Sequence, residues 1–150
     1  MYHRILVPID GSPTAERGLR EAIRLAAEQK GKLRLLHVID DFPMLMEMST
    51  ISSFDASLQK LREYGESVLA AGKAAAAQSE VEVDTILREV TRGRIADVVI
   101  EEAKNAACDL VVMGTHGRRG FSRLALGSDA DLVVRGSPVP VLLVRQEPGA

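Results

Sequence analysis

Short apolar runs alternate with amphipathic stretches along this chain, and this alternation restricts its fold more than any other feature. Residues 4–9 lack the polar alternation of a half-exposed sheet, which predicts a fully buried strand. Further strands are predicted at residues 32–38, 81–87, 108–113 and 139–144. Helices are predicted between them at residues 13–30, 55–78, 94–107 and 128–135, and residues 40–50, which contain Pro43, are predicted to form a loop.

Strands separated by helices pair in parallel and connect through right-handed crossovers. We therefore expect an α/β fold, an open doubly wound parallel sheet of five strands in the order 3-2-1-4-5 with helices on both faces. Ligands of such sheets bind beyond the carboxyl ends of the strands, where the winding reverses. That point lies between the first and fourth strands, so Asp10 and Gly114 are expected to meet at one crevice.

The stretch from Gly114 to Ser128 has the composition of a phosphate-binding loop. Glycines at positions 114, 117, 120 and 127 allow backbone N–H groups to approach an anion, and Gly127 and Ser128 open a helix whose positive end suits a phosphate. Its three arginines make the stretch +3, although the whole chain is −2 and the remainder is therefore −5. A loop of this length is uncommon unless it binds something or is disordered, and we favour binding.

Composition excludes several other classes of protein. At 150 residues and 46% hydrophobic content, the chain fits a single domain over residues 1–150, with residues 146–150 as a short tail. A pI near 5.9 and 3% aromatic residues argue against nucleic-acid binding. No apolar run approaches the ~18 residues that span a membrane, and the N-terminus lacks a signal-peptide layout, so a cytoplasmic location is expected. Cys108 is the single cysteine, and the histidines show no metal-ligand spacing.

The residues also carry a resemblance. Asp10 follows ILVPI, HVID stands at residues 37–40, and Gly114, Gly117, Gly127 and Ser128 follow the pattern G-x2-G-x9-G-S. With PVPVLLVR at residues 138–145, the chain resembles the universal stress protein family over essentially its whole length. Members with this glycine pattern bind ATP, and a second branch without it does not, so the resemblance implies an ATP-binding, cytoplasmic protein of the stress response.

The resemblance also implies roles for individual residues. Pro8, Asp10 and Val38 match positions that line the adenosine site, and Gly114, Gly117, Gly127 and Ser128 match the phosphate-binding positions. Arg118 lies in the loop that covers the nucleotide, and Asp129 follows the serine. The Asp129 carboxylate would repel a triphosphate unless a cation such as magnesium lies between them, although no metal-binding motif demonstrates one.

Simpler interpretations stand beside these roles. The alternative role of Asp10 is only to cap the first helix, and that of Ser128 is to cap its own helix. His116 lacks a partner placed by sequence to make it catalytic, which favours backbone or solvent contacts. Methionines 44, 46 and 48 fit a flap over the nucleotide, a partner surface or a merely mobile loop equally well. Gly65 and Gly72 on the apolar stripe of the helix at residues 55–78 indicate close packing against a neighbour.

Three functions compete on these observations. The favoured one is an ATP-binding sensor or regulator with no catalytic residues, whose nucleotide occupancy changes the surface presented to an unknown protein partner. The second is slow ATP hydrolysis or autophosphorylation, for which no convincing general base is found. The third is a phosphoacceptor receiver domain, which would need an acidic cluster and an aspartate where this chain offers Arg88 and Glu89. P-loop and dinucleotide-binding motifs are absent.

The family resemblance further implies a homodimer joined through residues 139–144, an apolar strand expected at a sheet edge.

Overall fold

The computed structural model describes residues 1–47, 51–116 and 126–146. Its centre is one parallel sheet of five strands in the order β3-β2-β1-β4-β5. The strands are β1 (Arg4–Pro8), β2 (Lys32–Asp40), β3 (Val83–Val90), β4 (Leu110–Gly114) and β5 (Val141–Val144). The predicted fold class and strand order are therefore confirmed.

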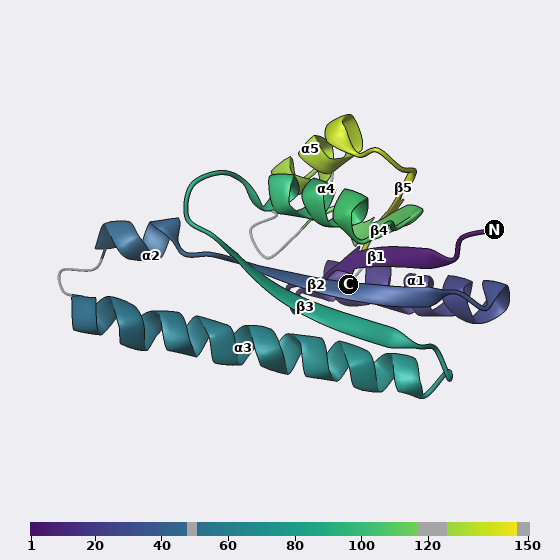
Figure 1. The fold of residues 1–150 in the computed structure, drawn as a ribbon, viewed down its shortest axis with the longest axis horizontal. Coiled ribbons are helices and arrows are strands. Elements are labelled where there is room, and N and C mark those ends of the chain that lie inside the picture. The colour runs from purple at the N-terminus through teal and green to yellow at the C-terminus, as the bar shows by residue number, and fades with distance from the viewer. Residues whose placement is uncertain (48–50, 117–125, 147–150) are drawn as a thin grey trace.

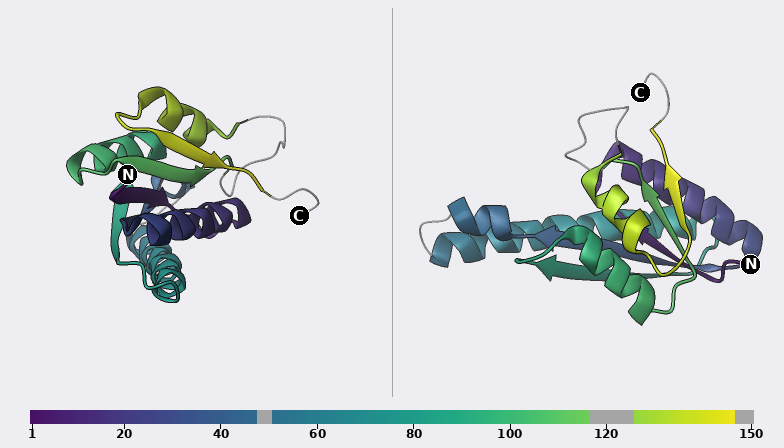
Figure 2. Two further views of the ribbon diagram at one scale, coloured as in Figure 1. Left: turned by 90° about the vertical axis from the view of Figure 1, so that its right-hand side faces the viewer. Right: turned by 90° about the horizontal axis from the view of Figure 1, so that it is seen from above.

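Helices cover both faces of this sheet (Figures 1 and 2). The helices are α1 (Pro13–Gln29), α2 (Phe42–Glu47), α3 (Ile51–Ala77), α4 (Ile95–Asn105) and α5 (Ser128–Gly136). Helices α1 and α3 lie on one face, and α4 and α5 lie on the other, as the left view of Figure 2 shows. Because β1 connects through α1 to β2 on one side and β4 connects through α5 to β5 on the other, the winding reverses between β1 and β4.

The central strand β1 supplies both cores because successive strand residues point to opposite faces. Ile5 and Val7 pack with α1 and α3 in one cluster, whereas Leu6 packs with α4 and α5 in the other. All three side chains are fully buried. A strand apolar on both faces is typical of a parallel sheet covered by helices, as the sequence predicted.

The expected loop at residues 40–50 is wrong in part, because α2 occupies Phe42–Glu47. Pro43 favoured a loop in the sequence analysis because proline interrupts the interior of a helix. In the structure it lies in the first turn of α2, where its missing N–H is not needed. The Asp40 carboxylate accepts from the Phe42 N–H at 3.2 Å, and the Asp41 carbonyl accepts from the Leu45 N–H at 2.9 Å. These two bonds start the helix.

Several further boundaries differ from expectation, and the largest differences are in α3 and β3. Helix α3 begins at Ile51 rather than residue 55, and β3 runs from Val83 to Val90 rather than over residues 81–87. The polar residues Arg88 and Glu89 extend β3 because it is an edge strand, where charged side chains are tolerated. They pair with Glu101 and Arg62 respectively.

The glycine stripe of α3 packs closely against β2 and β3, as predicted. A Cβ atom on Gly65 would lie 2.7 Å from Leu87 Cδ1 and 2.8 Å from His37 Cδ2. A Cβ atom on Gly72 would lie 2.8 Å from Leu35 Cδ1. Helix α3 therefore lies closer to the sheet than a helix with larger side chains at these two positions could lie.

Candidate functional site

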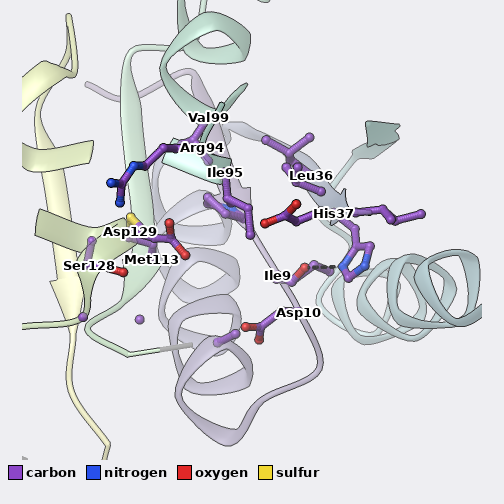
Figure 3. A pocket seen from close by; sticks show the side chains of 18 of the residues that line it. Ile9, Asp10, Leu36, His37, Arg94, Ile95, Val99, Met113, Ser128 and Asp129 are labelled. Atoms are coloured by element: carbon purple, nitrogen blue, oxygen red, sulfur yellow. Dashed lines mark hydrogen bonds between the residues drawn. The ribbon is translucent and has the colours of Figure 1, made fainter. Parts of the chain in front are cut away.

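A cavity of about 810 Å³ lies at the carboxyl ends of β1, β2 and β4, where the winding reverses (Figure 3). Seven of the nine predicted site residues line it: Pro8, Asp10, Val38, Gly114, Gly127, Ser128 and Asp129. The structure thus brings together two groups of residues that are far apart in the sequence. The other two, Gly117 and Arg118, lie outside the described residues, as do Gly120, Arg119 and Arg123.

The turn after β1 is built from local hydrogen bonds around Asp10. Ser12, not Asp10, caps α1, since its hydroxyl accepts from the Ala15 N–H at 3.2 Å. The Asp10 carboxylate instead accepts from the Ser12 N–H at 2.9 Å, which fixes a half-exposed carboxylate at the wall of the cavity. From α3, the Tyr64 hydroxyl donates to the Asp10 carbonyl at 2.9 Å. The interpretation of Asp10 as the helix cap is therefore wrong.

The opposite end of the cavity is the N-terminus of α5. Gly127 is the N-cap residue, and its N–H donates to the Thr115 carbonyl at 2.8 Å, which joins the start of α5 to the end of β4. The first backbone hydrogen bond of α5 runs from the Asp131 N–H to the Gly127 carbonyl at 2.9 Å. The N–H groups of Ser128 and Asp129 precede that bond, and such groups together with the helix dipole favour an anion. This end is suited to a phosphate.

Between these two ends the wall is apolar. Leu36, Ile95, Val99 and Met113 contribute side chains from β2, α4 and β4. Figure 3 labels all four, above Asp10 in that view. An apolar stretch of wall between a carboxylate and a helix N-terminus suits a ligand with a flat apolar part and a charged tail.

Sequence analysis missed several lining residues, chiefly His37, Tyr64 and Arg94. His37 is buried, and its Nδ1 lies 2.8 Å from the Ile9 carbonyl; since a carbonyl only accepts, Nδ1 carries the proton. The sequence signal that could have identified His37 was its position at the start of the HVID segment, residues 37–40. Tyr64 and Arg94 lie at positions that read as solvent-facing helix residues, so the sequence carries no local signal for either.

His116 lines the cavity, and its Nδ1 lies 3.0 Å from the Thr115 hydroxyl. This side-chain contact differs from the backbone or solvent contacts expected for His116. Met44 and Met46 lie in α2 and do not line the cavity, and Met48 lies outside the described residues. The flap hypothesis therefore stays a prediction.

The carboxylates of the site are not grouped in the manner of a metal centre. Over residues 1–47, 51–116 and 126–146, no cluster of three or more His, Cys, Asp or Glu side chains is arranged to hold a metal ion. Asp10, Asp40 and Asp129 reach the cavity from three different segments. Of the described helices, none is both long and apolar enough to cross a membrane.

Known proteins match the chain over nearly its full length. The universal stress protein family matches residues 1–145. Universal stress protein MJ0531 of Methanocaldococcus jannaschii is 31% identical, with 97% of this chain and 84% of that protein covered. Universal stress protein YxiE of Bacillus subtilis is 30% identical, with 97% and 100% covered. The solved structure of the hypothetical protein MJ0577 has a TM-score of 0.87 at 26% identity and 99% coverage of both chains.

Two more distant solved structures share the fold and contain nucleotides. A universal stress protein in complex with cAMP has a TM-score of 0.66 at 23% identity, covering 97% of this chain and 98% of that chain. An Arabidopsis thaliana family protein with AMP bound has a TM-score of 0.70 at 17% identity, covering 97% and 93%.

Proposed function

Since this chain belongs to the universal stress protein family, we propose that its cavity binds an adenine nucleotide, with ATP and magnesium as the resident ligand. One observation carries the proposal. The adenosine positions Pro8, Asp10 and Val38 and the anion-suited start of α5 at Ser128 line one cavity of about 810 Å³. That volume lies in the range of pockets that enclose most of a small organic ligand.

Each part of the cavity corresponds to a part of the nucleotide. The apolar wall formed by Leu36, Ile95, Val99 and Met113 accepts the base, and the Asp10 carboxylate accepts from the ribose hydroxyls. The start of α5 receives the phosphate end of the nucleotide, beginning with the first phosphate. The AMP and cAMP in the two fold neighbours support an adenine nucleotide as the class of ligand. Magnesium would shield the phosphates from Asp129.

The biological role that we propose is a cytoplasmic, nucleotide-dependent regulator of the stress response. Helix α5 starts at the cavity and leads directly into β5, so occupancy of the phosphate end is coupled to an edge of the sheet. We also propose that β5 joins two copies of the chain and that a further protein partner responds to the nucleotide state.

Isothermal titration calorimetry with magnesium-ATP tests the binding proposal. Substitution Ser128→Asp places a negative charge at the phosphate end, while acidic residues favour a helix N-terminus and so preserve α5. We expect wild-type protein to bind and Ser128→Asp to lose at least tenfold in affinity without a fall in melting temperature. Ser128→Ala, which adds no charge, is the control and should weaken binding much less. Absence of binding by wild-type protein, with no nucleotide found by mass spectrometry in the untreated preparation, would refute the proposal.

A further inference from the structure

Arg94 occupies an unusual place at the rim of the cavity. It lies at the N-cap of α4 and lines the cavity, and its side chain extends toward Ser128 and Asp129, away from Leu36 and His37 (Figure 3). The Arg94 N–H donates to the Asp97 carboxylate at 3.2 Å, and the Arg94 carbonyl accepts from the Asp97 N–H at 3.1 Å. These reciprocal bonds fix the backbone from which the long side chain leaves.

The backbone of Arg94 caps α4, but its side chain does not stabilise the start of that helix. Ser, Thr, Asp and Asn are the favoured N-cap residues because their short side chains accept from the first N–H groups. A guanidinium has no acceptor, and a positive charge is unfavourable at the positive end of the helix dipole. Within the described part of the chain Arg94 pairs with no carboxylate, whereas Arg34, Arg62 and Arg88 each do.

The charges around the cavity give Arg94 a specific task. Among the described residues that line the cavity, three are carboxylates, Asp10, Asp40 and Asp129, and Arg94 is the sole lysine or arginine. A nucleotide gains negative charge with each additional phosphate, and the phosphate end of the cavity is where Asp129 lies. A positive group that reaches this end therefore matters more for a di- or triphosphate than for a monophosphate.

We infer that Arg94 is a specificity-determining residue, whose guanidinium binds the phosphates beyond the first and makes the site prefer ATP and ADP over AMP. This inference rests on the proposed nucleotide-binding function. The fork of N–H donors on a guanidinium can donate two parallel hydrogen bonds to the oxygens of one phosphate. A single backbone N–H donates only one. The start of α5 then receives the first phosphate, and Arg94 reads the length of the chain beyond it.

The test is a set of calorimetric titrations with ATP, ADP and AMP in magnesium buffer. The proteins are wild type, Arg94→Gln, Arg94→Lys and the control Arg92→Gln. Arg92 is an exposed arginine in the same connection between β3 and α4, and it does not line the cavity. Arg92→Gln makes the same change in net charge as Arg94→Gln, but away from the site. Melting temperatures from circular dichroism identify any variant that is not folded.

We expect Arg94→Gln to weaken ATP binding about tenfold, the usual size for loss of a charge-assisted hydrogen bond, and AMP binding less than twofold. Arg94→Lys should retain part of the preference for ATP, and Arg92→Gln should retain all of it. Equal loss for ATP and AMP, no loss for ATP, or the same loss in Arg92→Gln would overturn the inference. Failure of wild-type protein to bind any of the three nucleotides would overturn the proposed function and this inference together, so the wild-type titration separates the two failures.

Discussion

Gly114 illustrates how one residue can satisfy two requirements. The sequence suggests a glycine that lets an anion approach, and Gly114 does line the cavity. The structure adds a packing requirement, because a Cβ atom on Gly114 would lie 2.9 Å from the Thr14 backbone carbon and oxygen. The first turn of α1 therefore packs against the end of β4 at a distance that only glycine allows.

Substitution Gly114→Ala should lower the free energy of unfolding by roughly 1–3 kcal/mol even without nucleotide, because backbone atoms of α1 must shift. Urea denaturation of the ligand-free protein measures this. Gly136→Ala is the control, since its Cβ would meet the flexible end of Ile100 and the helix gains propensity. Unchanged stability in Gly114→Ala would restrict the role of this glycine to ligand binding.

Cys108 is a second residue whose environment decides its chemistry. Its side chain is buried, and burial raises the pKa of the thiol, against an opposing effect of Arg4. The reactive form is the thiolate, so a raised pKa and lack of access both suppress reaction. We expect a thiol-specific reagent to label native protein very slowly at pH 8.5 and unfolded protein rapidly. Comparable labelling rates in water and in denaturant would contradict this assignment of Cys108 to the core.

At the scale of elements, the sequence predicted those strands and helices whose apolar residues recur at regular spacing. Each strand and the four longer helices follow from apolar spacing, and the crevice follows from the strand order. Helix α2 was missed because Pro43 is compatible with both a loop and a first helical turn. Arg94 was missed because a side chain that reaches a cavity from a helix cap produces no periodic signal. Tertiary geometry, not local preference, gives it a role.

The packing of α3 against β2 provides a prediction at this scale. Gly65→Val should lower the free energy of unfolding by roughly 1–3 kcal/mol, because the added carbons meet the His37 ring, which its bond to the Ile9 carbonyl holds in place. Ala71→Val, on the exposed face of the same helix, controls for the poorer helix propensity of valine and should cost about 0.5 kcal/mol. Equal losses in thermal or urea denaturation would show that α3 can move away from the sheet without penalty.

At the scale of the whole molecule, β5 is an outer strand of the sheet and leaves one large apolar side chain partly exposed. Val141 and Leu143 pack into the core with α4 and α5, and Val144 packs on the opposite face, but Leu142 belongs to neither core and is 39% exposed. An outer strand with unpaired backbone groups and an exposed leucine is a surface suited to pairing with a second copy. Because the Leu142 side chain is already exposed, a charged substitution there is compatible with folding.

Leu142→Lys should therefore convert the proposed dimer to monomer in sedimentation velocity experiments while leaving the circular dichroism spectrum unchanged. The lysine charges of two copies would face each other across the strand pair, where like charges destabilise association. Leu142→Val keeps an apolar side chain and should keep the dimer. Because β5 follows α5 directly, nucleotide affinity measured on the monomeric variant also tests whether the two surfaces are linked. If assembly changes affinity, dilution of wild-type protein must change it in the same direction as Leu142→Lys. A dimer that persists in Leu142→Lys would place the interface on another surface.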